Sequence, residues 1–218
     1  MSEPLRRLPI YLLLDCSESM AGEPIETVST GLHEFCVDLK NCPQCIEVAW
    51  LSVIALSSDA KLLTPLTELM DFSPPELPIG LGRSLGAALE LLSDRIAQEV
   101  RPMTRDEIGD FHPFVVLVTS GPFTDNWHEP LARFKATNKR YKLRDRDITA
   151  IGFGSGADVS MLREIAPQVF IASDPRAALK IEIAHIEGGF GERFKVKGGA
   201  IVDETIYDFS VWREDWAP

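Results

Sequence analysis

An aspartate and two serines stand at alternate positions in the segment Asp15-Cys16-Ser17-Glu18-Ser19, directly after an almost continuously apolar run at residues 8–14. A short apolar run that ends in a polar turn is typical of a strand buried on both faces of a parallel sheet. One carboxylate and two hydroxyls in a tight loop can converge on a single hard cation such as Mg²⁺ or Mn²⁺. The segment therefore predicts a candidate metal loop. An alternative needs no ion, because short Asp and Ser side chains also stabilise turns by bonding to the backbone.

A second group with ligand chemistry consists of His33, Cys36, Cys42 and Cys45, in the spacing His-x2-Cys-x5-Cys-x2-Cys. Thiolates and a ring nitrogen at such spacings can hold zinc. A lone Cys-x-x-Cys can also carry thiol redox chemistry, and buried cysteines are often simply core residues. All three interpretations remain open, and unligated thiols are favoured.

Residues for nucleophilic catalysis do not form a recognisable set. No serine lies in a Gly-x-Ser-x-Gly elbow, and the four histidines stand in unrelated contexts. The glycine-rich residues 80–84 lack the lysine of a phosphate-binding loop, and residues 152–156 lack the pattern of a dinucleotide-binding fingerprint. The sequence therefore predicts a protein that is not an enzyme.

The elements that must position these loops alternate along the chain. Apolar runs predict strands at residues 8–14, 46–56, 61–66, 114–118, 148–153 and 169–171. Apolar stripes predict helices at residues 25–39, 85–100, 127–141, 160–165 and 175–183. A short polar link joins the second and third strands as a hairpin, so the third strand is expected to be antiparallel. The order predicts a doubly wound, three-layer α/β/α fold with a mostly parallel six-stranded sheet and one antiparallel edge strand.

Composition limits the class of protein. The chain has 218 residues, of which 45% are hydrophobic and 25% charged, which suits one domain with a substantial core. A formal net charge of −11 argues against nucleic acid and anionic membranes as partners, because both are bound through basic patches. No stretch approaches the ~20 apolar residues of a membrane span, and no signal-peptide core follows the N-terminus. We therefore expect a cytoplasmic protein with four reduced cysteines.

The loop after the first strand resembles the metal-ion-dependent adhesion motif of von Willebrand factor A domains. Within that family the chain resembles the tellurium-resistance TerY-like branch, in residues 8–20, 22–25, 48–54, 85–89, 124–127 and 151–154. The resemblance extends over roughly residues 8–184. It implies a protein-interaction role in a bacterial tellurium-resistance or stress-response system, and protein partners such as a protein kinase or a PP2C-type phosphatase.

Two of the three metal loops of that family are altered here. Arg83 stands where the second loop has its threonine, in Arg83-Ser84-Leu85-Gly86, and Ser120 replaces the aspartate of the third loop, in Thr119-Ser120-Gly121. We predict that Arg83 pairs with Asp15 and blocks the position of the cation, since a fixed guanidinium satisfies a carboxylate directly. The resemblance then implies a degenerate adhesion site without a cofactor.

The alternative keeps Mg²⁺ or Mn²⁺ on Asp15, Ser17 and Ser19, with Glu18, Ser84, Ser120 or Asp125 as auxiliary ligands. It would make the chain a metal-dependent binding protein or metal sensor, or, less favoured, a metal-dependent hydrolase.

The last part of the chain differs in composition. From residue 185 glycines cluster, and acidic and aromatic residues follow. We divide the chain into a von Willebrand factor A domain at residues 1–184 and a C-terminal appendage at residues 185–218, with a hairpin-like segment around Gly198-Gly199. The aromatic residues are expected either to cover the chain's own domain or to dock a partner.

Overall fold

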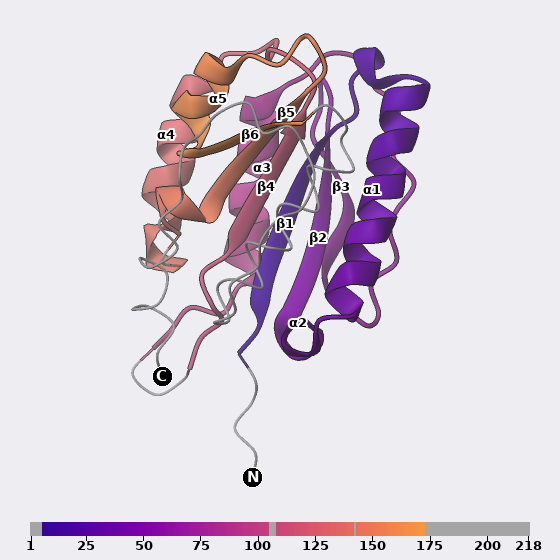
Figure 1. The fold of residues 1–218 in the computed structure, drawn as a ribbon. Coiled ribbons are helices and arrows are strands. Elements are labelled where there is room, and N and C mark those ends of the chain that lie inside the picture. The colour runs from indigo at the N-terminus through magenta and orange to yellow at the C-terminus, as the bar shows by residue number, and fades with distance from the viewer. Residues whose placement is uncertain (1–5, 105–107, 142, 173–218) are drawn as a thin grey trace.

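A six-stranded sheet lies between helices in the computed structural model, which describes residues 6–104, 108–141 and 143–172 (Figure 1). The strand order is β3-β2-β1-β4-β5-β6. Parallel pairing joins β1 (Leu8–Asp15), β2 (Ala49–Leu56), β4 (Phe114–Thr119), β5 (Ile148–Phe153) and β6 (Gln168–Ala172). The remaining strand, β3 (Lys61–Glu68), pairs antiparallel with β2 at one edge. The predicted fold class is therefore confirmed.

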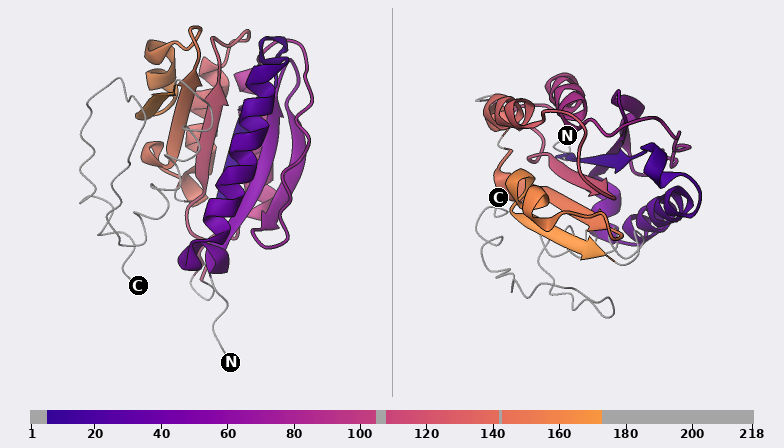
Figure 2. Two further views of the ribbon diagram at one scale, coloured as in Figure 1. Left: turned by 45° about the vertical axis from the view of Figure 1, so that its right-hand side comes forward. Right: turned by 90° about the horizontal axis from the view of Figure 1, so that it is seen from above.

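The central strand β1 is buried along its whole length, because its alternate side chains face two apolar layers. Ile10 and Leu12 pack in one layer with residues of α1 (Glu23–Lys40). Tyr11 and Leu13 pack in the other with residues of α3 (Leu85–Glu99), α4 (His128–Thr137) and α5 (Val159–Ile165). The view from above in Figure 2 shows α1 and α3 on opposite faces of the sheet. Each fully buried Leu or Ile contributes about 1.5–3 kcal/mol, so these layers hold the site without any ligand.

Two predicted boundaries are wrong. Residues 46–48 belong to the short helix α2 (Pro43–Val48) and not to β2, because Cys42 caps the helix and Pro43 starts it with a preset φ angle. The predicted helix at residues 127–141 ends as an α-helix at Thr137 and continues as the 3-10 turn η2 (Asn138–Tyr141). Two further 3-10 turns are η1 (Glu18–Met20) and η3 (Asp145–Asp147). The predicted helix at residues 175–183 and the hairpin-like appendage lie outside the described residues.

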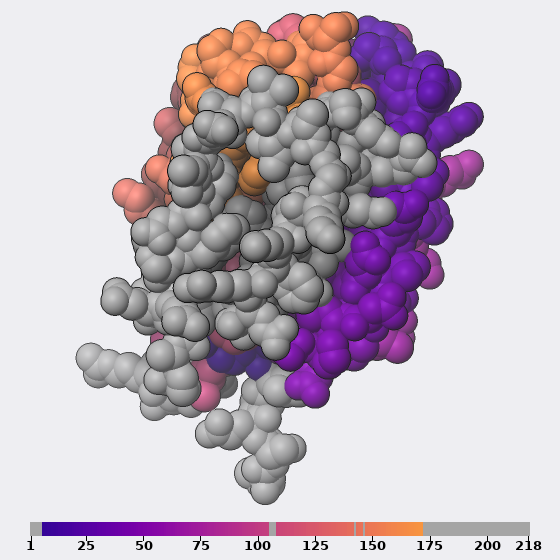
Figure 3. Space-filling model, viewed as in Figure 1, coloured from indigo at the N-terminus to yellow at the C-terminus, as the bar shows by residue number. Residues whose placement is uncertain are grey.

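Strand register brings the candidate loops together at the carboxyl ends of the parallel strands. Asp15 is the register partner of Leu56, and Leu14 is the partner of Val118, so the ends of β1, β2 and β4 coincide. Strand order reverses between β1 and β4, and in such folds ligands bind at this edge. In Figure 3 the orange surface from the last part of the described chain meets the indigo surface of the first helix at the same upper edge.

Among the residues that the structure describes, no helix is long and apolar enough to cross a membrane.

Candidate functional site

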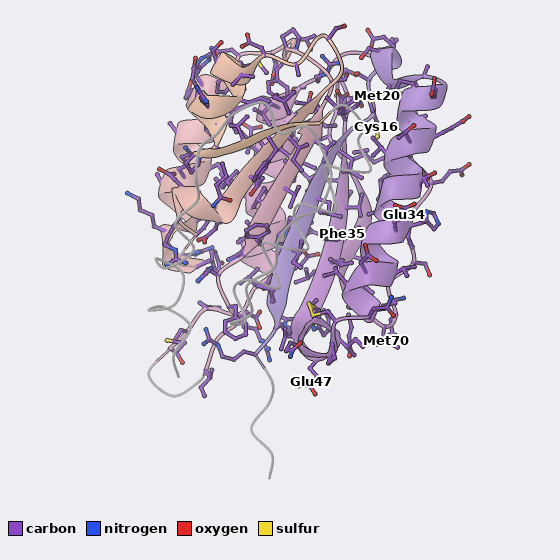
Figure 4. The ribbon with its side chains drawn as sticks, in the orientation of Figure 1. Cys16, Met20, Glu34, Phe35, Glu47 and Met70 are labelled. Carbon is purple, nitrogen blue, oxygen red and sulfur yellow. A yellow bond between two sulfur atoms is a disulfide. The ribbon has the colours of Figure 1, made fainter. Side chains whose placement is uncertain are left out.

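Three loops meet at the carboxyl ends of the parallel strands. Asp15 ends β1, Thr119 ends β4, and Arg83 lies in the loop that precedes α3. Figure 4 labels Cys16 and Met20, which follow Asp15, at this upper edge of the sheet. The side chain of Arg83 therefore contacts Ser17 and Ser120, which are 66 and 37 positions away from it in the chain.

The guanidinium of Arg83 lies at the centre of the three loops. Its Nε is 2.7 Å from Asp15 Oδ2, in an ion pair that lacks hydrogen-bond geometry. Its Nη2 donates to the hydroxyl oxygens of Ser17 at 3.0 Å, Ser19 at 2.5 Å and Ser120 at 2.9 Å. The Arg83 side chain is 9% exposed and the Asp15 side chain 0%, so solvent screens this pair much less than a surface pair.

The Asp15 carboxylate is also saturated by neutral donors. Its Oδ1 accepts from the backbone N–H of Ser17 at 3.0 Å and from the Ser17 hydroxyl at 2.6 Å. Its Oδ2 accepts from the Thr119 hydroxyl at 3.1 Å, and from the Ser120 N–H and hydroxyl at 3.0 and 3.1 Å. These donors compensate for the water that the buried carboxylate has lost.

The loop after β4 holds Arg83 in this position. Arg83 N–H donates to Thr124 Oγ1 at 3.0 Å, and Thr124 N–H donates to the Arg83 carbonyl at 2.8 Å. Arg83 Nη1 donates to the Pro122 carbonyl at 2.9 Å. A Cβ on Gly121 would lie 2.8 Å from Nη1, so a larger residue at this position would displace the guanidinium. The contacts that Thr119, Pro122 and Thr124 make here were not predicted: Thr119 and Thr124 were noted only as parts of family motifs, and Pro122 carries no signal of this role.

The auxiliary ligands suggested by the sequence have other partners. Glu18 Oε2 accepts from the backbone N–H of Gly82 at 2.6 Å, which ties the first loop to the second. Asp125 accepts from the Ser84 hydroxyl and the Gly86 N–H, both at 2.7 Å, and from the Leu85 N–H at 3.0 Å. Asp125 therefore caps the first turn of α3 together with Ser84, whose own side chain accepts from Ala87 N–H.

The residues present do not fit a divalent cation. The Arg83 guanidinium lies within 3.0 Å of the oxygens of Asp15, Ser17, Ser19 and Ser120, which is the position that an ion would need. Its positive charge repels a second cation at that distance. In the part of the chain that the structure describes, no three His, Cys, Asp or Glu residues lie where they could hold a metal ion together.

The cysteine cluster is not brought together as a zinc site. The expectation of four reduced cysteines is wrong for Cys42 and Cys45, which form a disulfide because the first turn of α2 brings their Cα atoms to 5.2 Å. Cys36 is a buried free thiol, as is Cys16. The His33 ring is exposed on α1, with Nδ1 bonded to the carbonyl of Ser29 at 2.9 Å.

Comparisons with known proteins agree with this architecture. The model of the family "von Willebrand factor type A domain" matches residues 10–183. Proximal thread matrix protein 1 from the mussel byssus has a TM-score of 0.59 and 19% identity, over 84% of this chain and 48% of that chain. A von Willebrand factor type A protein from Catenulispora acidiphila has a TM-score of 0.59 and 18% identity, over 83% and 42%. BatB from Bacteroides thetaiotaomicron has a TM-score of 0.56 and 16% identity, over 83% and 97%.

These identities show a common fold alone, and the chain spans less than half the length of the mussel and Catenulispora proteins. The mussel protein has also been solved with zinc in its metal-ion-dependent adhesion motif, at a TM-score of 0.53 and 19% identity, over 83% of this chain and 47% of that chain. A comparison with curated proteins gave no match.

Proposed function

The chain belongs to the von Willebrand factor type A domain family over residues 10–183, and we propose that it binds a protein partner at its Arg83 face without a metal ion. Domains of this family are generally interaction or adhesion modules and not enzymes. The observation that carries the proposal is the buried Arg83–Asp15 pair at 2.7 Å, which supplies the positive charge that a metal would otherwise bring to this edge of the sheet.

The surface around Arg83 has the character of a protein contact. Leu81 is 74% exposed and Ile79 44% exposed, in the loop that leads into Arg83. Large exposed apolar side chains that are held in place are suited to the core of an interface. The Leu81 loop is fixed by backbone bonds from Ser58 N–H to the Leu81 carbonyl and from Gly80 N–H to the Cys16 carbonyl. A partner would therefore meet a preformed surface and lose little loop entropy on binding.

Sequence motifs support a narrower role within the family. Residues 8–20 and 124–127 resemble the TerY-like branch, so we place the chain in a bacterial tellurium-resistance or stress-response system in the cytoplasm. By the same resemblance, a protein kinase or a PP2C-type phosphatase is the partner to test first.

The test is binding of such a kinase or phosphatase to the immobilised full chain, in Mg²⁺ and again in EDTA. We expect equal affinity in both buffers. Leu81→Ser should weaken binding about tenfold, since an interface hot spot contributes more than ~1 kcal/mol. Met70→Ser is the matched control, because Met70 is 56% exposed but lies at the lower end of the sheet (Figure 4). Loss of binding in EDTA, or equal effects of the two substitutions, would contradict the proposal.

A further inference from the structure

A disulfide lies at the opposite end of the sheet from Arg83. Figure 4 shows the disulfide beside α2 at the lower end, close to the labelled Glu47. Its sulfurs belong to Cys42, which caps α2, and Cys45 in the first turn. We propose that Cys42 and Cys45 form a reversible thiol–disulfide site that exchanges electrons with low-molecular-weight thiols and their disulfides.

The disulfide closes too short a ring to serve mainly as a fold-stabilising crosslink. Its cysteines are separated by three positions, and a crosslink constrains the unfolded chain least when its loop is short. The same turn is held by backbone bonds from Cys42 N–H to the Leu39 carbonyl and from Ile46 N–H to the Cys42 carbonyl, both at 3.1 Å. Opening the disulfide therefore leaves the turn in place and the two sulfurs adjacent, which is what re-formation requires.

The two sulfurs differ in a way that assigns their roles. Both cysteines are buried, but Cys42 is followed directly by the exposed Pro43 and Gln44. Cys45 N–H donates to Cys42 Sγ at 3.3 Å, and such a donor stabilises negative charge on that sulfur once the disulfide is reduced. Cys42 is thus the attacking thiolate, and Cys45 is the resolving thiol behind it.

The other two cysteines are unsuited to this chemistry. Burial raises the pKa of the Cys16 thiol to about 12, and the neighbouring Asp15 carboxylate adds to the rise. Burial likewise raises the pKa of the Cys36 thiol to about 12, with only partial opposition from Lys40. Both are free thiols without a disulfide partner, whereas Cys42 and Cys45 are joined to each other.

Oxidation by glutathione disulfide takes place in two balanced displacements. The Cys42 thiolate attacks one sulfur of glutathione disulfide, so a Cys42–glutathione bond forms, the glutathione S–S bond breaks and one glutathione thiolate leaves. Cys45 then gives its proton to water and attacks Cys42 Sγ, which forms the protein disulfide and releases the second glutathione thiolate. Two electrons pass from the protein to glutathione disulfide, and reduced glutathione reverses both steps.

The experiment equilibrates the folded full chain with mixtures of reduced and oxidised glutathione, followed by acid quenching, denaturation and alkylation. Trypsin then separates residues 8–40, which carry Cys16 and Cys36, from residues 41–61, which carry Cys42 and Cys45. We expect the 41–61 peptide to shift reversibly from dithiol to disulfide as the oxidised fraction rises, while the 8–40 peptide stays fully alkylated. If the 41–61 peptide stays in the same redox state, dithiol or disulfide, in every mixture, the proposal is overturned. This test uses the wild-type chain and does not depend on whether any variant folds.

Single substitutions test the assigned roles. Cys45→Ser should accumulate a glutathione adduct on Cys42 about tenfold faster than Cys42→Ser does on Cys45, because exchange follows thiolate character and access. Cys36→Ser is the matched control and should leave the dithiol–disulfide shift unchanged. Equal adduct rates in the first two variants, or loss of the shift in Cys36→Ser, would contradict the assignment. None of these readouts depends on partner binding at Arg83.

Discussion

Replacement of Arg83 by Met removes the guanidinium and keeps a side chain of similar length. The change leaves the Asp15 carboxylate, with 0% of its side chain exposed, without its ion-pair partner at 2.7 Å. We expect the variant to fold and to be much less stable than the wild type, because a buried charge without its partner is costly.

The magnitude follows from the burial of the pair and from the bonds that remain. Removal of one partner from a buried pair costs about 3–5 kcal/mol. Asp15 keeps hydrogen bonds from Ser17, Thr119 and Ser120, so the lower end of that range, about 3 kcal/mol, is expected. For a chain of this size each kcal/mol lowers the Tm by about 2–4 °C, so the fall should be roughly 6–12 °C.

Urea and thermal unfolding followed by circular dichroism measure this loss against a matched surface pair. Arg133 contacts Glu90 at the same 2.7 Å, but their side chains are 60% and 59% exposed. Arg133→Met should therefore cost less than about 1 kcal/mol. The double variant Arg83→Met with Asp15→Asn should be more stable than Arg83→Met alone, because it leaves no unpaired buried charge at position 15. An Arg83→Met variant as stable as Arg133→Met would refute the reasoning.

Three further outcomes are expected. EDTA should leave the Tm of the wild type unchanged, because apolar layers hold the fold; a fall of several degrees would reveal a structural ion. Arg83→Thr combined with Ser120→Asp should bind Mg²⁺ in calorimetry more tightly than the wild type, and equal affinities would argue against Arg83 as the block. Burial raises the pKa of Asp110, but hydrogen bonds from Arg7 and Arg101 outweigh it and leave the pKa below its usual value. Because the pKa of Asp110 is lower in the folded state than in the unfolded state, ionised Asp110 stabilises the fold above about pH 4. This contribution is lost as the pH falls through the folded-state pKa of Asp110. Asp110→Asn should thus be less stable than the wild type in urea at pH 7, with a difference that shrinks below about pH 4; a constant difference would contradict the assignment.

The sheet could be predicted from the sequence because its central strands β1, β2, β4 and β5 are buried on both faces. Residues 8–14 form an almost continuously apolar run, which has few interpretations other than a central parallel strand. The start of β2 was harder, since Ile46 and Val48 favour a strand while Pro43 favours a helix start. Here the local signal of Cys42 and Pro43 prevailed over the β-branched side chains.

The site was only partly predictable because its contacts join distant segments. Arg83 could be related to Asp15 because a family motif aligns the two loops and a guanidinium there is unusual. The role of Asp125 could not be predicted, since its partners at the start of α3 are about 40 positions earlier in the chain. A carboxylate in a loop gives no indication of which helix start it will reach, and only the packing of α3 against α4 decides that.

Arg83 also gives the three loops a positive charge that is always present, because it is part of the same chain. A bound Mg²⁺ exchanges with bulk solvent, so the loaded fraction of a protein follows the free ion by mass action. The guanidinium is tethered to the same chain as Asp15, so their association is unimolecular and insensitive to ion supply. If a partner binds at the face around Leu81, as we propose, that face forms during folding, and its assembly does not depend on the uptake or release of an ion.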